Sequence, residues 1–274
     1  MQWLYLNGSL VPGEEATVSA LDPAVFHGQA LVETFAARNN GVFRLADHYD
    51  RLRQGGAVLG IVVPISLPDL ETAVATLLDR NEADDARLRL TVTAGQTGAE
   101  PTVALMASPL DDYPPELYKQ GMHVTIADVR RNETSPLSRI KCAAGLLDGL
   151  LARETARARN FDDAVLLNTQ GSVACGAVAN VFIAYHGRIL TPPVSSGALP
   201  GITRGAVLAL AREEGIDATE ADFSLRELTG ADEAFFTNSV MGVMPVTRID
   251  GTRFEHGLLT AHLQEALHRA ASGE

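Results

Sequence analysis

The sequence predicts a mixed α and β fold (α+β) in two domains, and three observations support this. Segments typical of helices and of strands occur in both halves of the chain. The 274 residues, of which 46% are hydrophobic, suffice for two cores. Between the halves, residues 108–121 (SPLDDYPPELYKQG) combine turn-forming and acidic residues, as linkers do. We expect a small N-terminal α/β domain at 1–112, a linker at 113–121 and a larger C-terminal domain at 122–274.

In the N-terminal part, hydrophobic periodicity predicts the elements in order. Residues 3–8 (WLYLNG) read as an opening strand that runs into a turn. Residues 46–60 and 67–80 carry apolar side chains at helical spacing and predict two amphipathic helices. Residues 86–95 (ARLRLTVTAG) alternate apolar and polar side chains, which predicts a half-buried strand with 102–108 as its neighbour.

The C-terminal part mixes short strands with three helices, which supports the same fold class. The expected strands are 122–128, 163–168, 171–175, 180–185, 188–192, 233–238 and 243–249. The expected helices lie near 145–159, from residue 202 onward and near 257–271.

Composition and charge argue against several classes of function. The net charge of -12 argues against general affinity for nucleic acid, which needs a basic surface. The longest apolar run, GIVVPI, is too short to span a membrane, and the first residues lack the features of a signal peptide. Cys142 and Cys175 form no CxxC pair and the histidines show no ligand spacing, so we expect no disulfide and no metal site. The cytoplasm is the expected compartment.

The chain contains only two lysines, Lys119 and Lys141, although lysine and arginine together number 22. Lys141 stands in SRIKCAAG (138–145), beside small apolar residues. Because burial disfavours the ammonium form, a lysine in such surroundings is available as a nucleophile or base, for example toward an aldehyde cofactor. The alternative is a solvated surface lysine that happens to follow an arginine.

Two further stretches indicate an anion site. In LPGITRGAVLALAREEG (199–215) a glycine precedes a helix start, and Thr203 stands at the entrance. Unpaired backbone N–H groups and a hydroxyl at such a place suit a phosphate, although a plain turn and helix cap is the alternative. The small polar residues of FFTNSVMG (235–242), which follow a strand, would complete the phosphate site.

Together these stretches resemble the class IV aminotransferases, pyridoxal-phosphate enzymes of fold type IV. That family includes branched-chain aminotransferases, D-amino-acid aminotransferases and 4-amino-4-deoxychorismate lyase. The resemblance implies a small N-terminal α/β domain, a larger C-terminal domain and a homodimer, with pyridoxal 5′-phosphate between the domains. Four blocks in the family's order carry it: 28–52 (GQALVETFAARNNGVFRLADHYDRL), 168–184 (NTQGSVACGAVANVFIA), 190–208 (LTPPVSSGALPGITRGAVL) and 235–251 (FFTNSVMGVMPVTRIDG).

The resemblance implies a role for each matched residue. Lys141 falls at the family's Schiff-base lysine, which also acts as acid and base on the substrate Cα proton. Arg51 matches the arginine of the His-x-x-Arg-Leu motif, whose guanidinium binds the cofactor phosphate, and His48 is expected to seat it. The other phosphate donors match Ile202, Thr203, Asn238 and Ser239.

Cys175 departs from the family's pattern. The family places a glutamate in Gly-x-Val-x-Glu-x-x-x-x-Asn, where it pairs with the pyridine nitrogen and keeps the ring an electron sink. Here GSVACGAVAN puts Cys175 at that position, and no Asp or Glu occurs from Ala164 to Arg212. Three interpretations are possible. Cys175 is a neutral thiol, which makes the cofactor ring a weaker electron acceptor, or it is a thiolate paired with a protonated pyridine nitrogen. In the third, the chain has the family's fold but does not catalyse ordinary transamination. We expect the neutral thiol, because an unpaired buried charge is costly.

Other features favour the lyase branch. Val32 replaces an expected aromatic, and KCAAGLL has Leu146 where the branched-chain enzymes have a tyrosine. Thr34 matches a threonine that lies near the reacting centre of the lyases, and TNSVMGVMPV resembles the lyase version of the last block. Loss of pyruvate from aminodeoxychorismate leaves aromatic p-aminobenzoate, so a weak electron sink is more tolerable there. We therefore expect 4-amino-4-deoxychorismate lyase, an enzyme of folate biosynthesis.

Two alternatives stay open. The first is a class IV transaminase that acts on D-amino acids, branched-chain amino acids or amines. The second is a relative that binds pyridoxal phosphate with altered catalysis because of Cys175. In each case the expected partner is a small amino substrate. Arg87 and Arg89 lie on one face of their strand. They either face solvent or bind the carboxylate of this substrate.

Overall fold

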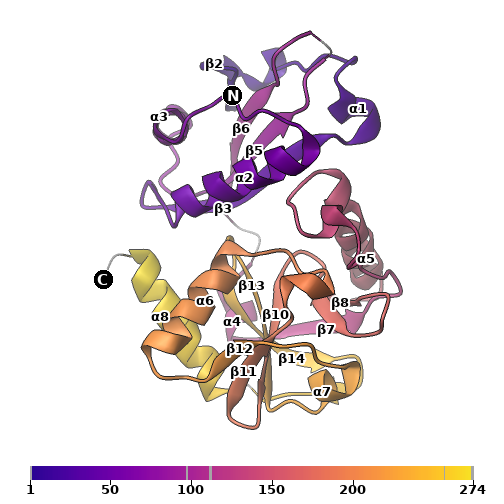
Figure 1. Ribbon diagram of the computed structural model, residues 1–274. Helices are drawn as coiled ribbons and strands as arrows, with labels where there is room; N and C mark the ends of the chain where they lie inside the picture. The colour runs from indigo at the N-terminus through magenta and orange to yellow at the C-terminus, as the bar shows by residue number, and fades with distance from the viewer. Residues whose placement is uncertain (1, 97, 111–112, 256, 273–274) are drawn as a thin grey trace. The chain divides into compact units, whose positions relative to one another are not determined.

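The computed structural model describes residues 2–96, 98–110, 113–255 and 257–272. Over these residues the chain forms two compact units, each with its own hydrophobic core. The first unit runs to residue 110 and also includes Ile140–Gly145, and the second contains the remainder. The predicted mixed α and β fold class is confirmed (Figure 1). The domain end expected at residue 112 lies outside the described residues.

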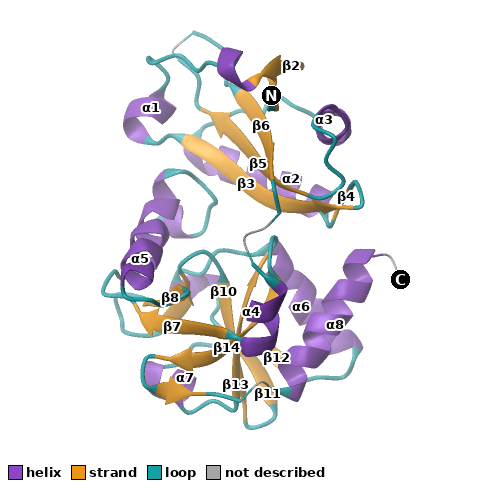
Figure 2. Ribbon diagram, turned by 180° about the vertical axis from the view of Figure 1, so that it is seen from behind, coloured by secondary structure: helices purple, strands orange, loops and turns teal. Residues whose placement is uncertain are grey.

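The first unit is built on an antiparallel sheet, whose described strands follow the order β2-β1-β6-β5-β3-β4 (Figure 2). These strands are β1 (Trp3–Leu6), β2 (Ser9–Pro12), β3 (Ala30–Arg38), β4 (Gly41–Val42), β5 (Ala86–Thr93) and β6 (Val103–Ser108). The helices are α1 (Pro23–His27), α2 (Leu45–Leu59) and α3 (Leu67–Arg80), and a 3-10 turn spans Gly13–Glu15.

Helices α2 and α3 pack on the sheet of the first unit, and the sequence predicted both of them. The Ser66 hydroxyl caps α3 by accepting from the Asp69 N–H, and Leu70 and Leu77 lie two turns apart on its buried stripe. Strand β3 was not predicted as a strand. Residues on both of its faces are buried, so the alternation of apolar and polar side chains that marks β5 is hidden there.

The second unit contains a larger mixed sheet, whose described strands follow the order β12-β11-β10-β13-β14-β7-β8-β9, with β15 paired to β14. Strand β7 pairs in parallel with both β14 and β8. The strands are β7 (Met122–Ile126), β8 (Asp163–Leu167), β9 (Val173–Gly176), β10 (Asn180–Tyr185), β11 (Arg188–Thr191), β12 (Ala218–Glu220), β13 (Glu233–Asn238), β14 (Gly242–Ile249) and β15 (Thr252–Arg253). The helices are α4 (Pro115–Gln120), α5 (Leu147–Ala158), α6 (Ile202–Glu213), α7 (Leu225–Thr229) and α8 (Leu258–Ser272), with 3-10 turns at Pro136–Ser138, Ala144–Leu146 and Val194–Ser196.

Helices α6 and α8 pack together against β13 and β14, and α5 packs on β8 (Figure 1). Phe182 of β10 and Phe235 of β13 stack in the core, with ring centroids 4.9 Å apart. The stretch 113–121, which we expected to be a linker, contains the short helix α4, and the Tyr118 hydroxyl of this helix donates to the Met241 carbonyl at 3.0 Å. No helix within the described ranges combines the length and the apolar character needed to cross a bilayer.

Candidate active site

The segment Ile140–Gly145, which contains Lys141, is bonded to the sheet of the first unit. The Val32 N–H donates to the Lys141 carbonyl at 2.9 Å, and Cys142 forms an antiparallel bridge with Leu31. We expected this lysine in the C-terminal domain. Its backbone instead lies beside β3, which is more than a hundred residues earlier in the chain.

Lys141 and Thr34 lie on the same face of β3. Directly opposed residues of an antiparallel pair share a face, and the bridge between Cys142 and Leu31 puts Lys141 opposite Val32. Thr34 follows Val32 by two residues, so it lies on that face too. Both side chains are half-buried, whereas Cys142 and Leu31 are buried. The structure therefore brings the two predicted catalytic residues to one face of the sheet.

The other face of β3 carries a buried charged cluster of Glu33, His48 and Arg51. The fully buried Glu33 accepts from Arg51 Nε at 2.8 Å and from Arg51 Nη2 at 2.6 Å. Nδ1 of His48, one helical turn from Arg51 on α2, lies 2.7 Å from Glu33 Oε2. Burial raises the pKa of Glu33, but the hydrogen bonds from His48 and Arg51 outweigh it and hold the pKa below its usual value. Glu33 therefore stays charged and fixes the orientation of Arg51.

The sequence identified Arg51 and His48, and it showed Glu33 in the Glu-Thr pair of the first block without indicating its role. The predicted contact of Arg51 with the cofactor phosphate stays a prediction, and the structure shows what holds this arginine in place. A signal for Glu33 was present in the sequence, because a lone acid inside the apolar stretch ALVETFAA needs a cationic partner when it is buried.

In the second unit, the start of α6 presents backbone donors. Gly201 is the N-cap residue, and because glycine has no side chain, the N-cap position leaves the N–H groups of Ile202 and Thr203 without a side-chain cap. A Cβ at Gly201 would lie 2.0 Å from Asn180 Oδ1, so this close approach requires glycine. Such a helix start attracts anions through its N–H groups and its dipole.

Hydroxyl groups gather beside this helix start. Thr203 Oγ1 donates to Ser239 Oγ at 3.4 Å, which joins the two stretches predicted to bind phosphate. Thr237 Oγ1, two residues before Ser239, is buried without a hydrogen-bond partner among the described residues. Asn238 Oδ1 accepts from the Val240 N–H at 2.9 Å and so shapes the turn, and its place at the phosphate site stays a prediction. A phosphate group fits these donors, which are the N–H groups at the start of α6, the hydroxyls of Thr203 and Ser239, and the hydroxyl of Thr237.

Cys175 lies on β9 as a buried, free thiol. Burial raises its pKa to about 11; nearby Arg131 opposes the rise, and Asp163 and Asp148 reinforce it. The thiol is therefore un-ionised at neutral pH, which supports the neutral reading over the thiolate. It belongs to a small buried apolar cluster made mostly of alanines: Ala127, Ala152, Ala156, Ala164, Leu166 and Ala174.

Asp163, at the start of the strand next to β9, is a buried acid that sequence reasoning missed. Its Oδ1 accepts from the Ala164 N–H at 2.7 Å, whereas its Oδ2 has no hydrogen-bond partner within the described ranges. Burial raises the pKa of Asp163 to about 6, and the hydrogen bond from Ala164 and the charges of Arg153 and Arg157 oppose the rise. It precedes Ala164 by one position, so it lies just outside the stretch in which we found no acid.

Arg131 is a second residue that sequence reasoning missed. It is buried in the second unit, where its Nη2 donates to the Ser138 carbonyl at 3.2 Å and its Nε donates to the Gly197 carbonyl at 3.3 Å. Through these bonds it holds the loop that leads toward Lys141. No motif marks it, because these two bonds join it to backbone carbonyls.

Comparison with known proteins places this arrangement in a family. Residues 30–249 match the family described as amino-transferase class IV. The chain is 34% identical, over 273 residues, to a putative branched-chain-amino-acid aminotransferase of Methanocaldococcus jannaschii, with 96% of this chain and 94% of the relative covered.

Solved structures are similar along the whole chain. The branched-chain aminotransferase of Thermoproteus uzoniensis, solved with norvaline, has a TM-score of 0.91 and 32% identity, with 100% of this chain and 96% of that chain covered. A branched-chain amino acid aminotransferase from T.th., solved with pyridoxamine 5′-phosphate, has a TM-score of 0.91 and 26% identity, with 99% and 94% covered.

These proteins are named as aminotransferases, so they support the transaminase alternative and not the expected lyase of folate biosynthesis. The expected fold type, the expected cofactor and the expectation of an enzyme are confirmed. The chain belongs to the class IV aminotransferase family, whose members use pyridoxal 5′-phosphate.

Proposed function

We propose that this chain is an aminotransferase that moves the amino group of an aliphatic, branched-chain-type amino acid to a 2-oxo acid. The Methanocaldococcus jannaschii relative is named for branched-chain amino acids, and the Thermoproteus uzoniensis structure contains norvaline, which supports this substrate class. The observation that carries the proposal is the uncapped start of α6 with the hydroxyls of Thr203 and Ser239 beside it. Such a site suits the phosphate of the cofactor.

The proposed roles follow from the donors present. When bound, the cofactor supplies an aldehyde carbon and a ring that accepts electrons from the substrate Cα. Lys141 Nζ would hold the cofactor at this carbon and would serve as the acid and base for the substrate Cα proton. The N–H groups of Ile202 and Thr203 and the hydroxyls of Thr203 and Ser239 would bind the phosphate, with Asn238 beside them. Arg51, oriented by Glu33, is proposed as a further phosphate ligand.

In this proposal Thr34 contacts the substrate, and Cys175 affects how well the cofactor ring accepts electrons. Thr34 offers a hydroxyl to the substrate on the face of β3 that Lys141 shares. Cys175 would stand at the ring nitrogen as a neutral thiol, which would donate only a weak hydrogen bond and carry no negative charge. We therefore expect slower transfer than a carboxylate at this position would support.

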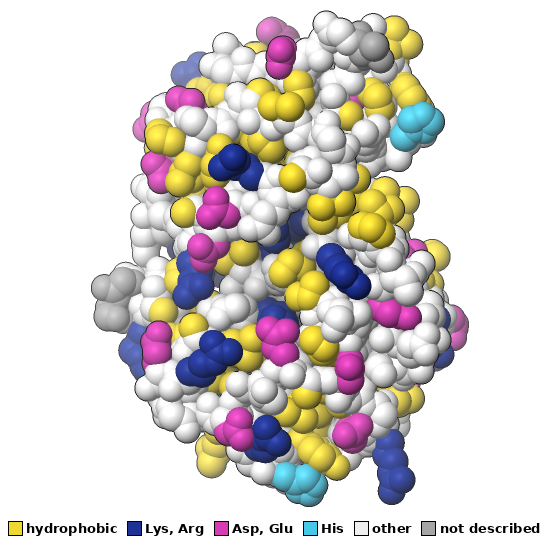
Figure 3. Space-filling model, in the orientation of Figure 1, with side chains coloured by type: hydrophobic (Ala, Val, Ile, Leu, Met, Phe, Trp, Pro, Cys, Tyr) yellow, Lys and Arg dark blue, Asp and Glu magenta, His cyan; other side chains and the backbone are white. Residues whose placement is uncertain are grey.

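A homodimer and a cytoplasmic setting complete the proposal. Leu147, Leu150 and Leu151 lie on one side of the first turns of α5 and are 63%, 46% and 59% exposed. Figure 3 shows hydrophobic side chains gathered over this helix. An apolar stripe of this kind is typical of a surface that another chain covers. Both cysteines are free and buried, as in a reducing compartment.

The two lysines of the chain allow a matched test. Borohydride reduction of the protein loaded with pyridoxal phosphate, followed by peptide mass spectrometry, is expected to place the label on Lys141. Lys141→Ala is expected to lose the label and to lower kcat by about a thousandfold or more, because the same nitrogen binds the cofactor and moves the proton. Lys119→Ala, which alters an exposed lysine of α4, is expected to retain both.

The reaction is tested in parallel with single substrates. Leucine or norvaline, supplied without an oxo acid, is expected to yield the matching 2-oxo acid and pyridoxamine 5′-phosphate. Formation of p-aminobenzoate from aminodeoxychorismate, without any oxo acid from the amino acids, would replace the proposal by the lyase reading. A label found only on Lys119 would reject the assignment of Lys141.

A further inference from the structure

Three basic side chains form a row across the larger sheet. Arg248 of β14 pairs with His123 of β7 on one side and with Arg253 of β15 on the other. Neighbouring strands lie about 4.8 Å apart, so the three residues fall within about 10 Å of one another. Directly opposed residues share a face, which puts all three on one side of the sheet.

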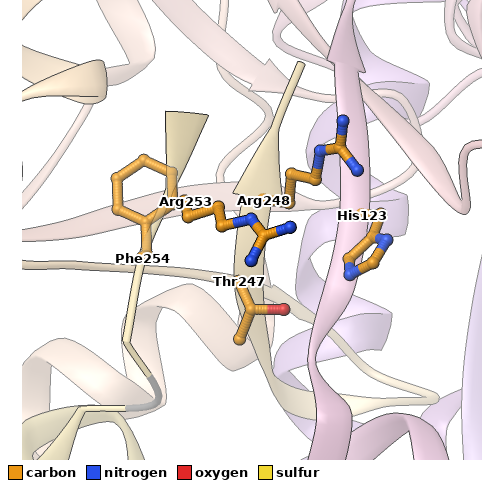
Figure 4. A pocket seen from close by; sticks show the side chains of 5 residues that line it. All are labelled: His123, Thr247, Arg248, Arg253 and Phe254. Carbon is orange, nitrogen blue, oxygen red and sulfur yellow. The ribbon is translucent and has the colours of Figure 1, made fainter. Parts of the chain in front are cut away.

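These three side chains line an open pocket together with Thr247 and Phe254, and its volume is about 310 Å³. In Figure 4 the guanidinium of Arg253 reaches across β14 close to Thr247, and Phe254 stands at one side. The volume is at the small end of the range for ligand sites, which begins at about 300 Å³. The pocket therefore has room for a small ligand with one charged group.

No ion pair within the described part of the chain neutralises this row, although the Asp162 carboxylate accepts from the His123 backbone N–H at 2.7 Å. The ion pairs found there involve none of His123, Arg248 and Arg253. Arg248 Nε donates to the backbone carbonyl of Asp250 at 2.7 Å, which holds the side chain without neutralising it. The carboxylate of Asp250 accepts instead from Thr125 Oγ1 and from a backbone N–H of β7.

Like charges directly opposite each other on paired strands destabilise a sheet. Two opposed arginines are therefore unexpected in a chain whose net charge is -12, where acidic partners are plentiful. A bound anion would remove the repulsion between them. Guanidinium groups bind phosphate oxygens in pairs, and the His123 ring lies beside them; the Thr247 hydroxyl lines the pocket but already donates to the Gln120 carbonyl at 2.7 Å.

We propose that this pocket binds the phosphate group of a small phosphorylated metabolite. A phosphate monoester carries about two negative charges and three acceptor oxygens at pH 7, which matches two guanidinium groups better than a single carboxylate does. The pocket is separate from the proposed cofactor site. Gly242, at the start of β14, pairs with Asn238, and Arg248 lies six residues further on, about 20 Å along the strand.

The test uses protein saturated with pyridoxal phosphate, so that the cofactor's own phosphate site is filled. Inorganic phosphate, glucose 6-phosphate and succinate are titrated by isothermal calorimetry at low salt. We expect the two phosphates to bind and to raise the Tm, and succinate to bind at least about tenfold more weakly. No binding of either phosphate at millimolar concentration would overturn the proposal. Binding of inorganic phosphate without the sugar phosphate would overturn the assignment to a metabolite.

Variants locate the binding. Arg248→Gln/Arg253→Gln is expected to weaken phosphate binding by about tenfold or more, because charge-assisted hydrogen bonds are lost. Arg253→Gln alone alters an exposed side chain and shows the same direction if the double variant folds poorly. The matched control, Arg212→Gln/Arg226→Gln, removes the same charge from exposed sites of the same unit and is expected to retain the affinity. Equal weakening in the control would mean a general charge effect and would overturn the proposal. Phosphate binding is measured without turnover. The result can therefore be interpreted even if the protein lacks the proposed transaminase activity.

Discussion

Glu33 and Asp163 are both fully buried carboxylates, yet their pKa values move in opposite directions. Burial raises both. Glu33 gains hydrogen bonds from His48 and Arg51 that more than compensate, whereas in the described residues Asp163 has only backbone N–H donors, chiefly that of Ala164, which do not outweigh its burial. Charge on Glu33 is therefore compatible with the fold, and charge on Asp163 is a cost to it.

This cost predicts a pH dependence of stability. Asp163 has a folded pKa of about 6, above the usual value of 3.8, so the folded state binds the proton more tightly than the unfolded chain does. The contribution of Asp163 to the free energy of unfolding is therefore full below about pH 4 and is lost as the pH rises through about 6. Two pKa units correspond to about 3 kcal/mol. Asp163→Asn removes this titration, so its urea-unfolding free energy is expected to lack the fall between pH 5 and pH 7.5.

An exposed carboxylate serves as the control for this comparison. Asp217, on the surface beside Arg188, has a side chain that is 59% exposed. Asp217→Asn is expected to keep the wild-type pH dependence, because surface ion pairs contribute little. If Asp163→Asn lost as much stability between pH 5 and pH 7.5 as the wild type does, burial of Asp163 would not be the cause.

At the residue scale, the sequence identifies functional residues better than it identifies their partners. Motifs in the family's order identified Lys141, Thr203 and Ser239. In the structure the hydroxyl of Thr203 donates to that of Ser239. The role of Glu33 was not predicted because its partners lie on α2, 15 and 18 residues later. The sequence predicted that Cys175 is a neutral thiol, because an unpaired buried charge is costly. It did not show which groups raise the pKa of this thiol, since they come from separate strands and helices.

At the scale of elements, the start of α6 depends on one glycine. The Cβ of an alanine at Gly201 would lie 2.0 Å from Asn180 Oδ1, and Asn180 Nδ2 already donates to the Leu199 carbonyl at 2.9 Å. The loop and the strand that carry these groups are thus locked together. Any side chain at this position must displace the donors of the proposed phosphate site.

Gly201→Ala is therefore expected to weaken pyridoxal-phosphate binding by about tenfold or more and to lower stability by about 1–3 kcal/mol, as overpacking does. Cofactor titration by absorbance and urea unfolding measure the two effects. Gly205→Ala is the matched control on the same helix, because a Cβ there has no atom within 4 Å. It is expected to bind the cofactor normally and to gain about 0.5–1 kcal/mol. Equal affinities in the two variants would contradict the role assigned to the helix start.

Elements with clear periodicity were predicted well. Helices α2 and α3 and strand β5 show one apolar and one polar side, which sequence alone reveals. Strand β3 is buried on both faces and gives no such pattern. The pairing of Lys141 with β3 was out of reach for a different reason, since it joins residues far apart in the chain.

At the scale of the whole molecule, the exposed stripe of Leu147, Leu150 and Leu151 on α5 makes dimerisation testable. Leu151→Glu places a charge in this stripe and is expected to shift the protein toward the monomer, measured by light scattering after size-exclusion chromatography. Leu258→Glu is the control, because Leu258 is 87% exposed on α8, outside the stripe. An unchanged mass in the Leu151→Glu protein would reject α5 as the dimer surface.

The fold class and the cofactor were predicted from the sequence, but the branch of the family was not. Leu146 and Thr34 favoured the lyase, yet the chain as a whole is similar to branched-chain aminotransferases. Reaction specificity depends on a pocket shaped by residues from many elements. A few local substitutions therefore carry less information about it than similarity over the full length.

The return of Ile140–Gly145 to the sheet of the first unit has a practical consequence. The polypeptide enters that unit twice, so no single cut in the gene separates the two units intact. A fragment that ended near the linker would lack the six residues that bond to β3, and the remaining fragment would carry the reactive lysine on a segment without its partner strand. Attempts to express either half alone should therefore graft these six residues back onto the N-terminal piece.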